Sequence, residues 1–259
     1  MAKLTRIEVL TLISKYPNDP LKILDACGGL YICPKDSSGK RLGPMVGYAG
    51  TDENGLQFVG DIYANFGKAE EYVDLIAYWT LTLSKKEPAL LSKVDVFCGL
   101  PEGGKAVAYA LAFAPSCSGR YVYLEKVVTA LKTASEREKS KLVFNRHEIA
   151  PGDRVGLVED LQNNFSTTGK AIDEVIKAGG EVVVLLSIMN RSPLVDNFFK
   201  WNGKKYPVVT LLRRPYPEYK QDDPEVEDDI LFGDVVWKPE NKNEWEKIKT
   251  VMEKYSKVK

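Results

Sequence analysis

Two adjacent carboxylates, Glu159 and Asp160, follow the apolar run at 155–158 and have the clearest chemical potential in the chain. Such a run predicts a buried strand, so both acids are expected at its end. A turn rich in hydroxyl groups, 166–169, follows and opens a predicted helix. The start of a helix offers unpaired backbone amides and the positive end of the helix dipole, which bind phosphate. Carboxylates repel phosphate but accept hydrogen bonds from sugar hydroxyls, so the segment predicts a site for a ribose 5-phosphate.

This segment resembles the phosphoribosyl pyrophosphate (PRPP) motif of type I phosphoribosyltransferases. In that family hydrophobic strand residues precede two acids, and a loop containing Thr-Thr-Gly, matched here by 167–169, holds the 5-phosphate. The resemblance implies that Glu159 and Asp160 hold the ribose hydroxyls. The loop is longer here than in the usual motif, so the residue that contacts phosphate stays open among the loop residues Asn163, Asn164, Ser166, Thr167, Thr168, Gly169 and Lys170. The alternative is an ordinary strand–loop–helix connection with incidental acids.

A second glycine-rich loop follows the strand predicted at 94–98 and precedes the helix predicted at 105–114. Glycines let a backbone approach a phosphate closely, and a lysine adds positive charge. A plain turn is the alternative, but the resemblance implies that this is the pyrophosphate loop, formed by Pro101, Glu102, Gly103, Gly104 and Lys105. An acid beside pyrophosphate suggests an intervening Mg²⁺ ion, which favours phosphate oxygens, one or two carboxylates and water. The expected cofactor is therefore Mg²⁺, bound mainly through PRPP rather than at a metal site of the protein.

The segment after the strand predicted at 121–124 resembles the mobile loop of orotate phosphoribosyltransferases. Lys126 matches the lysine of an Arg-Lys pair there, although Glu125 stands in place of the arginine. Thr129 stands where the loop lysine would come, and Lys132 is the nearest substitute. The resemblance implies that Lys126, Lys132 and Asp160 are the catalytic residues. The segment 129–145 is long and highly charged, which predicts a lid. A surface helix is the alternative.

Two basic residues are candidates for binding the nucleobase. Arg191 ends the strand predicted at 181–188, where orotate phosphoribosyltransferases carry an arginine that contacts the pyrimidine. A guanidinium suits the carbonyl and carboxylate edges of orotate, whereas a strand-end salt bridge is the alternative. Lys35 is the match, by resemblance, to an N-terminal lysine that covers the base.

The composition excludes several other classes of protein. The chain has 259 residues, of which 44% are hydrophobic and 28% charged, as in a globular protein. Lysine plus arginine equals aspartate plus glutamate at 36 each, so no overall charge points to nucleic acid or membrane. The cysteines at 27, 33, 98 and 117 lack metal-ligand spacing and only His147 could assist them, so a zinc site is not expected. No signal-peptide pattern opens the sequence, and we expect a cytoplasmic protein with free thiols.

Strand and helix patterns alternate between residues 91 and 193, which predicts an α/β fold with a parallel sheet flanked by helices. We expect one phosphoribosyltransferase-like domain, with an N-terminal helix and hood region at 1–90, a PRPP-binding core at 91–193 and a C-terminal extension at 194–259. Loops at the carboxyl ends of the strands, 99–104, 125–147 and 159–168, should converge on one site. Further elements are predicted as helices at 4–16, 68–84, 169–178 and 244–255 and strands at 206–212 and 233–237. The acidic run at 221–229 is predicted to be a solvated loop.

The resemblance implies the transfer of the phosphoribosyl group of PRPP to orotate, giving orotidine 5′-monophosphate and pyrophosphate. The partners expected are PRPP and a nucleobase, with orotate favoured, and the resemblance implies a homodimer. A phosphoribosyltransferase for a purine base, a non-catalytic PRPP-binding sensor and a structural α/β domain are the alternatives. The departure at Glu125 and the longer loop after Asp160 favour the sensor. No basic recognition helix of the kind found in a DNA-binding repressor is present in the sequence.

Overall fold

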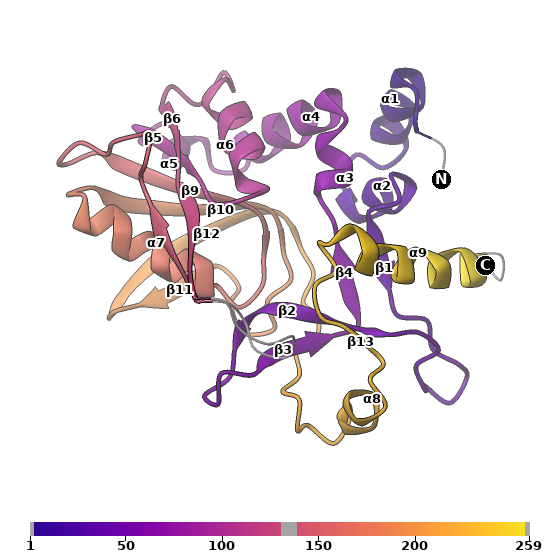
Figure 1. The fold of residues 1–259 in the computed structure, drawn as a ribbon. Coiled ribbons are helices and arrows are strands. Elements are labelled where there is room, and N and C mark those ends of the chain that lie inside the picture. Colours follow the sequence, from indigo (N-terminus) through magenta and orange to yellow (C-terminus); the bar gives the residue numbers. More distant parts are fainter. Residues whose placement is uncertain (1–2, 131–138, 257–259) are drawn as a thin grey trace.

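The computed structural model describes residues 3–130 and 139–256. Its centre is a six-stranded sheet in the order β11-β12-β10-β9-β5-β6, whose neighbouring strands are all parallel except β11 and β12 (Figure 1). These strands are β5 (Val96–Gly99), β6 (Arg120–Tyr123), β9 (Arg154–Gln162), β10 (Glu181–Asn190), β11 (Phe198–Trp201) and β12 (Lys204–Arg213). The predicted α/β fold with a parallel sheet flanked by helices is confirmed.

Helices cover both faces of this sheet (Figure 1). α4 (Val73–Ser84) and α6 (Gly104–Ala112) pack on one face, and α7 (Ser166–Lys177) packs on the other. Successive side chains of a strand point to opposite faces, and β9 follows this rule. Val158 belongs to the hydrophobic cluster of α4 and α6, whereas Leu157 belongs to the cluster of α7. The two residues that follow Val158 must therefore also point to opposite faces.

The order of the strands reverses between β5 and β9. The chain passes from β5 through α6 to β6 on one side, and from β9 through α7 to β10 on the other. β5 ends at Gly99, which pairs with Val158, whereas β9 and β10 stay paired as far as Gln162 and Asn190. β9 thus extends past its neighbour at the point where ligands bind in open parallel sheets, beyond the carboxyl ends of the strands.

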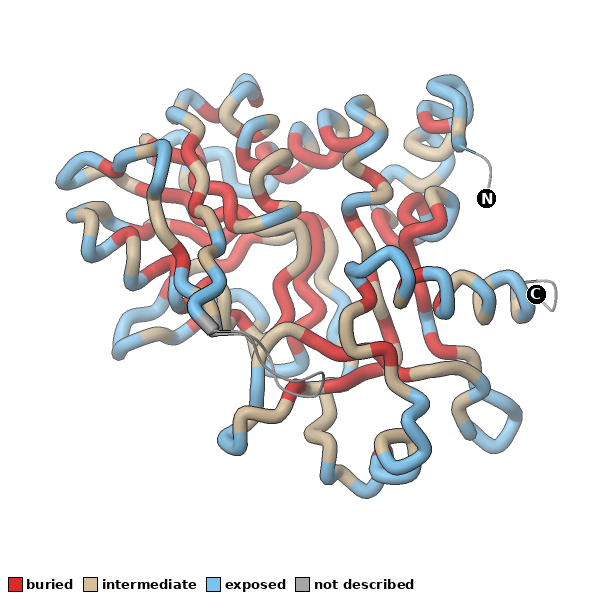
Figure 2. The backbone as a smooth tube through the Cα atoms, viewed as in Figure 1, coloured by how far each residue is buried: buried red, intermediate tan, exposed pale blue. Residues whose placement is uncertain are grey.

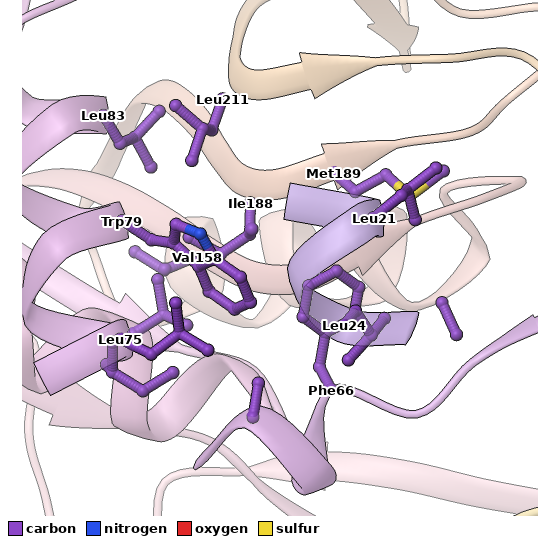
Figure 3. Close-up of a cluster of buried hydrophobic side chains, with 14 of the residues drawn as sticks. Leu21, Leu24, Phe66, Leu75, Trp79, Leu83, Val158, Ile188, Met189 and Leu211 are labelled. Atoms are coloured by element: carbon purple, nitrogen blue, oxygen red, sulfur yellow. The ribbon is translucent and has the colours of Figure 1, made fainter. Parts of the chain in front are cut away.

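The larger hydrophobic cluster joins the sheet to α4 and to the N-terminal region. Trp79 and Leu75 of α4 lie beside Val158 and Ile188 of the central strands, and Phe66 and Leu24 continue the cluster toward the N-terminus (Figure 3). Figure 2 shows the buried residues concentrated along the strands and on the inward sides of the helices. The end of β9 is therefore held on a rigid base.

The hood is a smaller layer beside the sheet and contains both ends of the chain (Figure 1). Its N-terminal strands are β1 (Leu30–Ile32), which pairs with β4 (Ile62–Ala64), and β2 (Met45–Thr51), which pairs with β3 (Gln57–Gly60). From the C-terminal part, β13 (Val235–Val236) adds to β2 in parallel, and α9 (Lys242–Ser256) places Trp245 against Tyr63, with 5.5 Å between ring centroids. Other hood and connecting helices are α1 (Arg6–Lys15), α2 (Pro20–Ala26), α3 (Gly67–Glu70), α5 (Pro88–Leu91) and α8 (Glu227–Leu231).

The described part of the C-terminal segment, residues 194–256, contributes to both the sheet and the hood. β11 and β12 widen the central sheet, and the chain then crosses to the hood and completes it. The strand predicted at 206–212 and the helix predicted at 244–255 are present as β12 and α9. The acidic run at 221–229 differs from the predicted solvated loop, because Val226 is fully buried and Asp229 pairs with Arg41 at 2.9 Å.

Two further segments differ from the sequence prediction. Residues 166–169 form the first turn of α7, and the preceding Asn163, Asn164 and Phe165 make the connection from β9. The described parts of the predicted lid form a hairpin of β7 (Glu125–Ala130) and β8 (Lys139–Val143). Among the described residues, none of the helices is long and apolar enough to span a bilayer.

α9 packs into the larger hydrophobic cluster, so a mutation that leaves a cavity at α9 should destabilise the whole protein. Ile248 on α9 is fully buried in the larger hydrophobic cluster. Replacing Ile248 by alanine should lower the free energy of unfolding by about 2–5 kcal/mol, as other large-to-small changes in a core do. Replacing its exposed neighbour Lys247 by alanine should change it by less than about 0.5 kcal/mol. Urea denaturation of both variants checks this; equal stabilities would mean that α9 does not belong to the cooperative core.

Candidate functional site

The two acids of β9 lie where β5 has ended, and their side chains point to opposite faces of the sheet. Glu159 points toward α7 and accepts a hydrogen bond from the Thr168 hydroxyl, with 3.3 Å between the oxygens. Asp160 points toward the start of α6 and accepts from the backbone amide of Leu161 at 2.8 Å. Both residues are half-buried. Arg41 and Arg154 pair with other acids, Asp61 and Asp95. A ligand that touches both carboxylates must lie across the end of the strand.

The environment of these acids disfavours their charged forms. Burial, and then the adjacent Asp160, raise the pKa of Glu159 to about 8, while the Thr168 hydroxyl lowers it. Burial likewise raises the pKa of Asp160, against the lowering effects of backbone hydrogen bonds and of Arg191. On α3, burial together with Asp160 and Glu102 raises the pKa of Glu70 to about 7. The carboxylates are thus crowded together without enough positive charge, which is typical of a site that receives a ligand.

The start of α7 lies beside Glu159 and offers backbone amides. Phe165 precedes the helix in the left-handed conformation, with φ at 60°, and the amide of Ser166 is capped by the Asn164 side chain at 3.1 Å. For the amides of Thr167 and Thr168, no acceptor is found within the described part of the chain. Since the first amides of a helix have no partner inside it, these two can bind an anion.

The predicted phosphate-loop residues divide into several groups. Ser166 and Thr167 are half-buried in the first turn of α7, and Lys170 is exposed on the next turn. Thr168 is buried and holds Glu159, whereas Gly169 is packed against the ring of Trp201, which leaves no room for a side chain. Asn164 donates to the carbonyl oxygen of Ala49 and so ties the loop to β2. Asn163 lines a cavity, described below.

The glycine-rich loop after β5 packs directly against β9. A Cβ atom on Gly103 would lie within 3.0 Å of the Asp160 carboxylate, and one on Gly104 would overlap the carbonyl oxygen of Val158. Glycine is therefore required at both positions. Lys105 forms an ion pair with Glu102 at 2.7 Å and lies 5.1 Å from the ring centroid of Tyr123. The structure thus brings the two predicted stations, 101–105 and 159–160, into contact.

A cavity of about 210 Å³ lies between the hood and the end of the sheet. Arg191 is buried beside it, donates from Nη1 to the carbonyl oxygen of Ile62 at 2.8 Å, and places its guanidinium carbon 3.7 Å from the ring centroid of Tyr48. Lys126, predicted as catalytic, lines the same cavity. Its other walls come from β2, β3, β4, the end of β9 with the residue that follows it, and the C-terminal segment: Gly47, Tyr48, Ala49, Gln57, Tyr63, Leu161, Asn163, Lys238 and Glu240.

One predicted base-binding residue, Lys35, is not brought to this cavity. Lys35 pairs with Asp61 at 2.7 Å and is not among the residues that line it. Lys132 lies outside the described residues. The structure adds Tyr48, Tyr63 and Glu240, which sequence analysis missed because they belong to the hood and to the C-terminal segment, where no motif marks them.

The described residues offer no protein cage for a metal ion. No group of three or more histidine, cysteine, aspartate or glutamate side chains among them could hold one. The acids at the end of β9 and Glu102 could still supply single carboxylates to an ion carried by a phosphate ligand, which is the usual mode for Mg²⁺. The donor set therefore fits a Mg²⁺ ion that arrives with its substrate and does not fit a resident metal.

Comparison with known proteins supports the resemblance found in the sequence. No protein-family model matches the chain. A curated orotate phosphoribosyltransferase from a Nitratiruptor species is 29% identical over 110 residues, which are 42% of this chain and 48% of that protein. The chain thus matches about half the length of that relative. This match confirms that the chain resembles the type I phosphoribosyltransferases.

Two solved structures similar to this one are both phosphoribosyltransferases. Orotate phosphoribosyltransferase from Aeropyrum pernix has a TM-score of 0.48 and 16% identity, covering 74% of this chain and 92% of its own. Adenine phosphoribosyltransferase from Thermoanaerobacter pseudethanolicus has a TM-score of 0.46 and 16% identity, covering 60% of this chain and 89% of its own.

The raised pKa of Glu159 predicts how stability depends on pH. Because this pKa is about 8 in the folded protein and ordinarily 4.5, the folded state keeps a proton that the unfolded state has released between these values. Stability should therefore fall as the pH rises from about 5 to 8. Glu159→Gln cannot ionise, so its unfolding midpoint should exceed that of the wild type by more at pH 8 than at pH 5.

Thermal unfolding of the ligand-free protein at several pH values measures this difference. Glu148→Gln, an exposed position away from the acids, is the matched control and should show a constant difference from the wild type. A Glu159→Gln midpoint that stays parallel to the wild type across this range would contradict the crowded environment described here.

Proposed function

We propose that this protein transfers the phosphoribosyl group of PRPP to a nucleobase, with orotate favoured, giving orotidine 5′-monophosphate and pyrophosphate. One observation carries this proposal. At the reversal of strand order, Asp160 packs against the glycines of the 101–105 loop, while Glu159 is bonded to Thr168 in the first turn of α7. This arrangement supports a ligand whose sugar lies between two phosphate groups, which is the layout of PRPP.

PRPP would lie across the end of β9. The carboxylates of Glu159 and Asp160 would accept hydrogen bonds from the ribose hydroxyls. The amides of Thr167 and Thr168 would donate to the 5-phosphate. The backbone of the 101–105 loop and the Lys105 ammonium group would face the pyrophosphate, and Mg²⁺ bound to PRPP would supply further positive charge there.

The proposed reaction depends on charge stabilisation more than on proton transfer. When the bond between C1 of the ribose and the pyrophosphate oxygen breaks, the sugar becomes oxocarbenium-like and the electron pair leaves with pyrophosphate. Lys105 and Lys126 would stabilise the negative charge that develops on this leaving group. A ring nitrogen of the base then forms the new bond to C1. An anionic base needs little help from a general base, which agrees with the presence of one histidine in the whole chain.

The charges around the cavity support an acidic base. Arg191, Lys126 and Lys238 line it, against the one carboxylate of Glu240. This excess of positive charge favours orotate, which carries a carboxylate, over neutral uracil, adenine or hypoxanthine. Arg191 is also held by Ile62 and Tyr48, so its position does not depend on the ligand.

A non-catalytic PRPP sensor is the second candidate function, and one observation favours it. Glu125, which stands where orotate phosphoribosyltransferases carry an arginine, accepts from Asn145 at 2.7 Å and lies 3.8 Å from Arg146. It therefore joins the start of β7 to the segment after β8 instead of adding positive charge for pyrophosphate. PRPP binding without turnover of any base would select this alternative.

The proposed reaction predicts pyrophosphate release only when PRPP, Mg²⁺ and orotate are present together. Replacing Asp160 by asparagine removes an acceptor for ribose hydroxyls, and kcat/KM for PRPP should fall by roughly 100-fold or more. Asp222→Asn, an exposed change far along the chain, should leave the rate unchanged. A coupled pyrophosphate assay measures all three proteins, and an unaltered Asp160→Asn rate would count against the assignment.

The cavity charges predict the order of base preference. With PRPP and Mg²⁺ saturating, kcat/KM should be highest for orotate and lower for uracil, adenine and hypoxanthine. A competition assay with the four bases measures this order directly. If a purine outcompetes orotate, the protein is a phosphoribosyltransferase for a purine base, and the proposal for the PRPP site still holds.

A further inference from the structure

Two buried polar atoms beside the cavity lack partners within the described part of the chain. They are the side-chain oxygen Oδ1 of Asn163 and the Nε–H group of Arg191. Asn163 is 8% exposed and Arg191 is 4% exposed, and both residues line the cavity. Leaving a buried donor or acceptor unpaired costs about 1–3 kcal/mol. The pair therefore points to a ligand that supplies one donor and one acceptor.

Glu218 determines which end of the Asn163 amide remains unpaired. The amide nitrogen Nδ2 of Asn163 donates to Glu218 Oε2 at 2.5 Å, and Nδ2 of Asn164 donates to the same oxygen at 3.3 Å. A carboxylate only accepts hydrogen bonds, so it holds the nitrogen of Asn163 and leaves its oxygen as the free acceptor. Glu218 lies in the segment after β12, which the resemblance to known enzymes hardly covers.

The two unpaired atoms define the edge of the molecule that they can bind. Asn163 Oδ1 requires a donor, which a ring N–H can supply, and Arg191 Nε–H requires an acceptor, which a carbonyl oxygen can supply. A heterocycle with a ring N–H beside a carbonyl group presents this pair on one edge. Tyr48 and Tyr63 add aromatic rings to the walls, which suit a flat ligand. Arg191, Lys126 and Lys238 favour negative charge on that ligand.

We infer that the acceptor substrate is an anionic heterocycle with a ring N–H beside a carbonyl, that Asn163 Oδ1 accepts this N–H, and that Glu218 is the positioning residue that presents the oxygen. The inference rests on the proposed function and assigns its specificity to residues that no motif marks. Orotate meets the description, because it has a second ring N–H between two carbonyl groups in addition to the nitrogen that is ribosylated. Adenine, which is neutral and has no carbonyl, does not.

The test compares orotate with 3-methylorotate, in which that second ring N–H is replaced by N–CH₃. Four proteins are compared: wild type, Asn163→Leu, Glu218→Gln and the control Glu225→Gln, which makes the same change at an exposed glutamate of the same segment. The measured quantity is the ratio of kcat/KM for the two bases. Binding of orotidine 5′-monophosphate and its 3-methyl analogue by calorimetry gives the same ratio without turnover.

The wild type and Glu225→Gln should prefer orotate over 3-methylorotate by about tenfold or more, since the loss of one buried hydrogen bond has an effect of this size. Asn163→Leu keeps a similar volume without the acceptor, so it should bind orotate about tenfold more weakly. Its preference between the two ligands should shrink. Glu218→Gln can donate to Asn163 Oδ1 and turn the amide around, so its preference should also shrink, with kcat at saturating base largely kept.

Each failure has a distinct meaning. If Asn163→Leu keeps the full preference for orotate while the unfolding midpoint is unchanged, Asn163 does not read the ring N–H and the inference is overturned. If Asn163→Leu loses the preference for orotate but Glu218→Gln keeps it, Glu218 does not position the Asn163 amide. If the wild type releases no pyrophosphate from PRPP with any base and binds no orotidine 5′-monophosphate, the proposed function itself fails and the inference fails with it.

Discussion

The approach of two backbones, without side chains between them, determines the architecture of the site. At the end of β5 the chain must turn into α6 while β9 continues beside it, and Gly103 and Gly104 let the turn lie directly on Val158 and Asp160. Any side chain at these glycines would push the loop away from the acids. The 101–105 loop and the acids at the end of β9 can therefore be adjacent only because this contact is made by glycine.

The opposite directions of Glu159 and Asp160 follow from the same geometry. Adjacent residues of a strand alternate between faces, so Glu159 is bonded to α7 and Asp160 lies near α6. Each acid is thereby associated with a different one of the two proposed phosphate sites, and a ligand that reaches both must bridge the strand. Their raised pKa values come from burial first, so a ligand that supplies hydroxyl donors or accompanying cations would restore the charged forms.

The core of the fold and the meeting of the 101–105 loop with the end of β9 could be predicted from the sequence, because their signals are local. Periodic apolar runs predicted β5, β9, β10 and most helices, and the motif predicted that Glu159, Asp160 and the 101–105 loop would meet. The cavity between the hood and the sheet could not be predicted, since Tyr48, Glu218 and Glu240 come from segments far apart in the chain. The sequence predicted a strand at 233–237, which contains β13, but it could not show that this strand pairs with β2, because β2 comes from the N-terminal part of the chain.

A crystal structure of the protein with ribose 5-phosphate tests the central claim most directly. The account predicts a sugar across the end of β9, with its hydroxyls within hydrogen-bond distance of the Asp160 carboxylate and its phosphate at the amides of Thr167 and Thr168. A ligand bound elsewhere, or one whose phosphate lies away from the start of α7 while Glu159 and Asp160 contact only protein, would contradict it.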